Sequence, residues 1–157
     1  MAENVPTGKK HLLSCLPENL ITRIEHFGST AVPNLAAKPI IDVMVGTTSL
    51  GKVIVQIVPI LDTQGYEYFW RPTYGYDGPP FYAWFIKRTS QGISMHHLHI
   101  VEDDFQDHWE SLRFRYYLIK YPEALIEYQS LKSTLVSKYK IIESNIQREK
   151  VSLLRIL

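Results

Sequence analysis

The run Ile40–Val45 (IIDVMV) places the strongest constraint on how this chain of 157 residues can fold. It is apolar at both odd and even positions, which is typical of a central strand whose two faces are covered. Such a strand requires a sheet with packing layers on both sides. Asp42 alone interrupts the pattern, and a carboxylate is costly to bury without a partner. The run therefore predicts a covered sheet and a specific role for Asp42.

The rest of the chain supplies the neighbours of this strand. Alternating and β-branched residues predict four further strands, at residues 21–27, 66–70, 81–88 and 93–101. The last two are joined by the turn Thr89–Gly92 and form a hairpin by spacing and composition. Apolar residues at helical spacing predict helices at 49–64 and 105–120, and a third that starts at Pro122 and runs past Lys138. This order predicts an α/β (α+β) fold, a sheet covered by helices with a helical C-terminal part.

Length and composition bound the class of protein. We expect one domain over residues 1–157, with the polar, turn-prone residues 1–19 partly disordered. The formal net charge of +1 argues against broad binding of nucleic acid or of anionic membranes. Cys15 is the only cysteine, which excludes an intrachain disulfide and a cysteine-based zinc site. Without a long apolar run or a signal-peptide pattern, a cytoplasmic location is expected. The oligomeric state stays open.

The segment Gly28-Ser29-Thr30 follows a predicted strand and has the composition of an anion-binding loop. A Gly-Ser pair at a strand end lets backbone N–H groups approach a phosphate closely, and the Ser and Thr hydroxyls add donors. Asp42, on the next strand, would hold a divalent cation such as Mg²⁺, Mn²⁺ or Zn²⁺ against the same phosphate. Alternatively, Gly28 only allows a tight turn, and Asp42 accepts hydrogen bonds from loop amides.

Three histidines, His96, His97 and His99, lie on one predicted strand. Period two places His97 and His99 on one face and His96 on the other. Two imidazoles spaced in this way can bind a metal ion or a phosphate. If this strand pairs beside Asp42, we expect the three side chains to line one cavity, with the Gly28–Thr30 loop at its rim. The alternative is that the histidines are partly buried and bonded to backbone carbonyls.

Four blocks of the sequence resemble the GrpB family. They are GSTAVPNLAAKPIIDVMV (residues 28–45), MHHLHIV (95–101), LRFRYYLIKYP (112–122) and EYQSLK (127–132), in the family's order and at similar spacing. The resemblance covers residues 21–140. It implies a minimal form of the nucleotidyltransferase fold with a mixed sheet, a domain that also occurs fused to dephospho-CoA kinase. It further implies a small phosphorylated ligand or a nucleotide as the binding partner.

Three basic residues are candidate partners for the phosphate. Lys38 matches the Ala-Lys-Pro of the family, and Arg115 matches the first Arg of its helix motif. Arg113 lies two residues before Arg115. For each of them, the alternative is a solvated surface cation.

Three departures from the resembled pattern bear on mechanism. Nucleotidyltransferases carry a second carboxylate two residues after the first, where this chain has Met44. A thioether does not hold magnesium, so the usual two-metal site is not expected on this strand. In the helix motif, Tyr116 and Ile119 replace an Asp and an Arg of the family, which removes any ion pair between those positions.

Three functions are compatible with these observations. The first is a nucleotide- or phosphate-binding domain in which Asp42 is the catalytic residue of metal-dependent nucleotidyl or phosphoryl transfer. The second is a non-catalytic binding or partner module descended from the same fold, which Met44 favours. The third is a metal-dependent hydrolase built on Asp42, His97 and His99. Fold alone does not choose among them.

Overall fold

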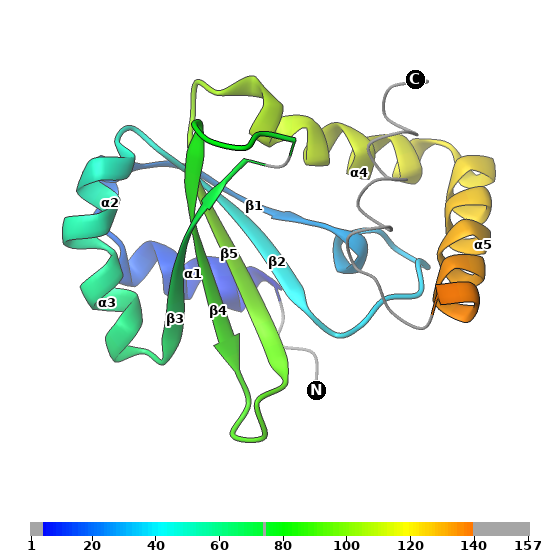
Figure 1. Ribbon diagram of the computed structural model, residues 1–157, viewed down its shortest axis with the longest axis horizontal. Coiled ribbons are helices and arrows are strands. Elements are labelled where there is room, and N and C mark those ends of the chain that lie inside the picture. Colours follow the sequence, from blue (N-terminus) through cyan, green and yellow to red (C-terminus); the bar gives the residue numbers. More distant parts are fainter. Residues whose placement is uncertain (1–4, 74, 140–157) are drawn as a thin grey trace.

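The computed structural model describes residues 5–73 and 75–139, and a five-stranded mixed sheet lies at its centre (Figure 1). The strands follow the order β1 (Ile21–Phe27), β2 (Ile41–Thr47), β5 (Ser94–Glu102), β4 (Phe81–Arg88) and β3 (Tyr66–Pro72). The β2–β5 pair is parallel, and the other three pairs are antiparallel. All five predicted strands are present among the described residues, and the α+β class is confirmed.

Helices accompany the sheet on both sides. They are α1 (Val5–Cys15), α2 (Leu50–Gln56), α3 (Val58–Thr63), α4 (Glu110–Lys120) and α5 (Pro122–Tyr139), with short 3₁₀ helices η1 (Glu18–Leu20), η2 (Ser29–Ala31) and η3 (Gln106–Trp109). The predicted helix over residues 49–64 is divided into α2 and α3. The reason is Pro59, which has no backbone N–H to donate and lies in the first turn of α3. Among the described helices, none combines the length and the apolar character needed to cross a membrane.

The side chains of the central strands alternate between two covered faces. Val45, Leu98 and Ile100 are buried in the main core, together with residues of α1, α2 and α3. On the opposite face, Met44 and Val101 are buried in a second cluster with residues of η3 and α4. Period two along a strand produces this separation. Strand β2 is therefore covered on both faces, as its apolar run predicts.

The N-terminal segment contains a helix that the sequence analysis does not assign. Residues Val5–Cys15 form α1, and Leu12 and Leu16 are buried in the main core. The prediction gave weight to the prolines and the glycine of this segment. It overlooked the spacing of the two leucines, which places both on one face of a helix. Residues 1–4 lie outside the described part of the chain.

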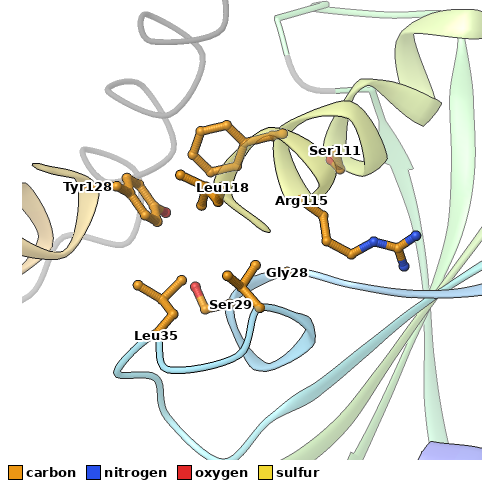
Figure 2. Close-up of a pocket in the computed structure, with 9 residues that line it drawn as sticks. Gly28, Ser29, Leu35, Ser111, Arg115, Leu118 and Tyr128 are labelled. Atoms are coloured by element: carbon orange, nitrogen blue, oxygen red, sulfur yellow. The ribbon is translucent and has the colours of Figure 1, made fainter. Parts of the chain in front are cut away.

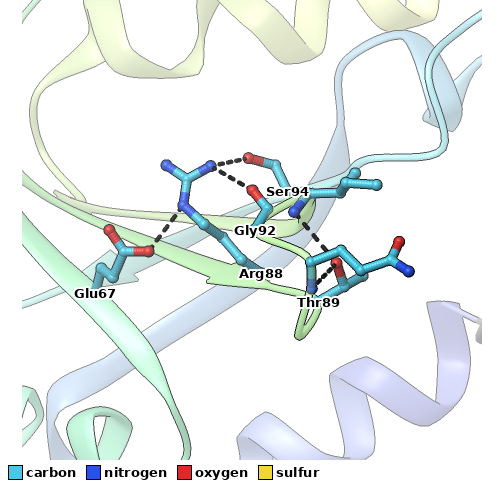
Figure 3. Close-up of polar contacts among 7 residues, drawn as sticks. Glu67, Arg88, Thr89, Gly92 and Ser94 are labelled. Atoms are coloured by element: carbon cyan, nitrogen blue, oxygen red, sulfur yellow. Dashed lines mark hydrogen bonds and ion pairs between the residues drawn. The ribbon is translucent and has the colours of Figure 1, made fainter.

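The β4–β5 hairpin helps to hold the histidine strand in register. At its turn, the Arg88 guanidinium donates hydrogen bonds to Ser94 Oγ at 2.9 Å and to the Gly92 carbonyl at 3.4 Å (Figure 3). The Nε of the same side chain lies 2.8 Å from Glu67 Oε1 on β3. An exposed ion pair adds little stability. Its effect here is to link three strands at the end of β5 where the histidines begin.

Replacing Leu12 with alanine tests whether α1 is an integral part of the fold. Leu12 is 4% exposed, so truncation should lower the free energy of unfolding by about 2–5 kcal/mol. Leu13→Ala is the matched control, because Leu13 on the same helix is 48% exposed and its truncation should change that energy by at most about 0.5 kcal/mol. Urea denaturation followed by circular dichroism measures both variants. Equal stability of wild type and Leu12→Ala would show that α1 does not contribute.

Candidate functional site

The parallel pairing of β2 with β5 brings one carboxylate and two imidazoles together. In this register Asp42 lies opposite His97, and Met44 lies opposite His99. Asp42 Oδ1 is 3.2 Å from His97 Nδ1 and 4.0 Å from His99 Nε2. One ligand atom of each residue lies within 4.8 Å of the other two. The predicted grouping is therefore present, and we call these residues the Asp–His–His cluster.

The spacing of these three atoms fits a single metal ion. A tetrahedral zinc ion with bonds of about 2.0–2.1 Å holds its ligand atoms about 3.4 Å apart. The 3.2 Å distance is close to this value, whereas the 4.0 Å distance is longer, so His99 Nε2 would have to move towards Asp42 on binding. The three side chains are between 18% and 25% exposed. The cluster is thus partly sheltered and still open on one side.

Two buried polar atoms beside the cluster have no hydrogen-bond partner among the described residues. They are His97 Nε2 and the indole Nε1 of Trp84. The two rings meet edge to face, with centroids 5.3 Å apart. A buried polar atom without a partner costs about 1–3 kcal/mol, so it calls for an explanation. Neither atom is accessible to solvent, so a partner would reach them only after a side-chain movement.

Aromatic rings restrict the orientation of His99. Tyr82 stacks on it with centroids 5.5 Å apart and an interplanar angle of 9°, and Phe27 packs against it edge-on at 5.0 Å. Burial raises the pKa of the Tyr82 hydroxyl, with the Arg71 charge acting in the opposite direction. The phenol therefore stays neutral at physiological pH. Contact from both rings limits the rotamers open to His99 and holds Nε2 near Asp42.

The loop after β1 meets the cluster at Gly28. Its φ of 75° and ψ of −171° fall in a region that is essentially restricted to glycine. A Cβ at this position would lie 2.7 Å from Asp42 Oδ2. Gly28 is therefore required both by the backbone conformation and by the close approach of the carboxylate. Its place beside Asp42 agrees with the prediction that this loop borders the site.

Thr30 connects the loop to the start of β2. Its hydroxyl donates to the Ile40 carbonyl at 2.9 Å and lies 3.0 Å from His26 Nε2. Because the hydroxyl proton is used by the carbonyl, His26 Nε2 carries the proton of the second bond. Burial lowers the pKa of His26; Asp42 opposes this shift, and Arg115 adds to it. A phosphate contact at Thr30 would have to replace one of these bonds.

Ser29 faces a small hollow between its loop and helices α4 and α5 (Figure 2). The hollow has about 210 Å³ of empty space, which includes the part open to solvent, so the enclosed space is smaller. The lining is mostly apolar: Gly28, Ser29, Val32, Leu35, Ser111, Phe114, Arg115, Leu118 and Tyr128. The lining does not include Asp42, His97 or His99. The hollow is thus separate from the Asp–His–His cluster, and Gly28 borders both of them.

Lys132 of α5 reaches the same loop. Its Nζ donates to Ser29 Oγ at 2.9 Å and to the Ala36 carbonyl at 3.1 Å. Burial lowers the pKa of Lys132. Tyr128, one turn earlier on the helix, has its hydroxyl pKa raised by burial and lowered to a smaller extent by a hydrogen bond with Ser29. Ser29 therefore lies between a lysine and a tyrosine of the same helix.

The three basic residues predicted to bind phosphate have different surroundings. Arg115 donates a hydrogen bond to the His26 carbonyl, and its Nη2 lies 3.6 Å from Glu25 Oε2. Figure 2 shows its guanidinium turned away from the hollow, towards the sheet. Arg113 is exposed and forms an ion pair within α4. Lys38 is exposed in the loop that precedes β2. Arg115 thus links α4 to β1, and Arg113 has the surface role named as its alternative.

The surroundings of Met44 explain why β2 has an apolar side chain, and not a second carboxylate, at this position. The side chain is 4% exposed and is packed among apolar residues, namely Phe27, Val101, Trp109 and Leu112. A carboxylate at this position would be desolvated among those groups, which is costly without a partner. The packing of α4 against the sheet therefore favours the apolar side chain.

Sequence reasoning did not single out two residues of the site, His26 and Lys132. His26 directly precedes the Phe27-Gly28 pair, but a strand histidine carries no signal of its own. Lys132 lies four residues after Tyr128, so the pattern places both on one helix face. Its partner Ser29 is 103 residues away in sequence. Only the tertiary packing of α5 reveals that contact.

Comparison with known proteins identifies the family. Residues 3–151 match the family described as GrpB protein. The chain belongs to the GrpB family. The crystal structure of conserved protein GrpB from Enterococcus faecalis has a TM-score of 0.75 and 30% sequence identity, over 96% of this chain and 90% of that one. The fold described above is thus a GrpB fold.

Two curated relatives agree with this assignment. Glutamate-rich protein GrpB of Alkalihalophilus pseudofirmus is 36% identical over 144 residues, which are 90% of this chain and 80% of the relative. UPF0157 protein YqkA of Bacillus subtilis is 32% identical over 119 residues, which are 76% of this chain but 32% of YqkA. This chain therefore corresponds to a minor part of the longer relative. The link between GrpB proteins and nucleotidyltransferases stays a prediction.

Replacing Gly28 with alanine tests the contact between the loop and Asp42. We expect a loss of unfolding free energy of at least about 1–3 kcal/mol, from the backbone conformation alone, with a further loss from the clash with Asp42 Oδ2. Gly92→Ala is the control, because Gly92 also has a positive φ, of 80°, but a Cβ there meets nothing within 4 Å. Thermal denaturation compares the two. Equal losses would show that the approach to Asp42 does not constrain Gly28.

Proposed function

We propose that this GrpB-family chain binds a small phosphorylated ligand at a single divalent metal ion held by Asp42, His97 and His99. The observation that carries the proposal is the position of Asp42 Oδ1, at 3.2 Å and 4.0 Å from two imidazole nitrogens. Two nitrogens and one oxygen favour zinc, manganese or iron over magnesium. The ion would act as a Lewis acid on a phosphoryl oxygen, or would lower the pKa of a bound water.

The Gly28–Ser29 pair supports a phosphate as the group bound next to this ion. Gly28 lies against Asp42, and the neighbouring Ser29 turns its hydroxyl into the adjoining hollow. A phosphate at the junction would meet the metal on one side and the loop on the other. The hollow is too small for a whole nucleotide. Any base or other large group of the ligand would therefore lie outside it.

Hydrolysis of a phosphate ester is the reaction that this donor set favours. Catalytic zinc sites typically have three protein ligands and keep one position for water. The Asp–His–His cluster offers three ligands, and its side chains are partly exposed. Nucleotidyl transfer by two metals would need a further carboxylate, and Met44 stands buried where that group is expected. One-metal chemistry is thus the better match.

Metal binding is the first test of this proposal. Zinc or manganese should raise the melting temperature of the wild type, because an ion that binds only the folded state stabilises it by mass action. Asp42→Asn keeps the side-chain volume and removes the charge, so the metal-induced shift should be lost. Asp104→Asn is the control, because Asp104 is exposed and lies outside the cluster. A shift of equal size in all three proteins would place the ion elsewhere and refute the proposed site.

A second test separates one-metal from two-metal chemistry. With magnesium and a panel of nucleoside triphosphates, we expect little or no release of pyrophosphate, because Met44 replaces the second carboxylate. With zinc or manganese and phosphate monoesters, we expect release of inorganic phosphate that is absent in Asp42→Asn. Robust magnesium-dependent pyrophosphate release that disappears in Asp42→Asn would show that the single carboxylate suffices for nucleotidyl transfer.

A further inference from the structure

We infer that Lys132 is the cationic anchor of the ligand phosphate, a role for which the sequence favours Lys38 and Arg115. The inference rests on the proposed function for the nature of the ligand, and it assigns a binding residue to α5, outside the sheet. Its basis is the position of Lys132 Nζ, 2.9 Å from the hydroxyl of Ser29. Ser29 belongs to the loop that meets the Asp–His–His cluster at Gly28.

Among the residues that the structure describes, no neighbouring acid balances the charge of Lys132. Its two hydrogen-bond partners, Ser29 Oγ and the Ala36 carbonyl, are both neutral. Over residues 5–73 and 75–139, no ion pair joins Lys132 to a carboxylate. A half-buried cation is expected to have a counter-ion. An anionic group at Ser29 would supply it. Burial lowers the pKa of Lys132, and a neighbouring anion would counteract this shift by favouring the charged amine.

The surroundings of Nζ also fit a phosphate oxygen. Ser29 can donate its hydroxyl proton to an anion while Lys132 donates N–H groups to the same anion. Tyr128 places a further hydroxyl beside Ser29. The apolar part of the hollow, including Leu35 and Leu118, keeps the local dielectric low, which strengthens each charge-assisted bond. Arg115 is less suitable, since it forms an ion pair with Glu25 and its guanidinium is turned away from the hollow.

Affinity for inorganic phosphate and for a phosphate monoester tests this role by isothermal titration calorimetry. Lys132→Met keeps the length and packing of the side chain and removes the charge. We expect its phosphate affinity to fall by about tenfold to a hundredfold, the range for loss of charge-assisted hydrogen bonds. Lys132→Arg should retain most of the affinity. Lys138→Met is the matched control, since Lys138 is exposed on the same helix, and it should bind as the wild type does.

The outcomes distinguish this inference from the proposed metal site. Phosphate affinity that is unchanged in Lys132→Met overturns the inference, and zinc binding by the same variant leaves the metal proposal intact. Phosphate binding that depends on Lys132 without any metal-induced stabilisation supports the inference and overturns the metal site. If Lys132→Met fails to fold, phosphate titration of the ¹⁵N-labelled wild type decides. Shifts of the Ser29 amide and the Lys132 side chain support the inference, and unchanged signals overturn it.

Discussion

Along the parallel ladder of β2 and β5, the residues of each pair point to the same face of the sheet. Val43 with Leu98 and Val45 with Ile100 fill the main core, while Asp42 with His97 forms the cluster on the other face. A one-residue slip of β5 would turn His97 and His99 into the core and Leu98 out of it. Burial of apolar surface, about 25 cal/mol per Å², therefore fixes the register. Hydrophobic packing on one face positions the polar chemistry on the other.

Gly28 connects the loop after β1 to the Asp–His–His cluster. Gly28 adopts a conformation open to few other residues, and a Cβ there would meet the Asp42 carboxylate. The position of β2 therefore determines the position of the loop. As a result, Ser29 lies between β1, α4 and α5. Thr30, through the Ile40 carbonyl, secures the other end of the loop. The loop from Gly28 to Thr30 thus connects the cluster and the hollow, although different elements form them.

Most of the sheet could be predicted from the sequence, because its strands have clear periodicity and its turns have clear composition. The Asp–His–His cluster could also be anticipated, since period two separates His97 and His99 from His96 and an apolar strand makes Asp42 conspicuous. The pairing of those two strands needed the structure. Helix α1 was not predicted, because two leucines are a weak periodic signal. The contact of Lys132 with Ser29 was not predicted, because Ser29 lies far away in sequence and no local pattern indicates such a contact.

The charges around the loop indicate what kind of ligand would complete it. Arg115 is matched by Glu25, and burial favours the neutral form of His26. Asp42 would offset one charge of a divalent ion, and the imidazoles add none when neutral. The remaining charge of the proposed ion would then lie on the Asp42 side of the Gly28–Ser29 pair, and Lys132 contacts Ser29. Two positive charges beside hydroxyl donors match a phosphate dianion better than a neutral molecule or a single carboxylate. If the proposed ion is bound, the electrostatic balance therefore favours a phosphate ligand.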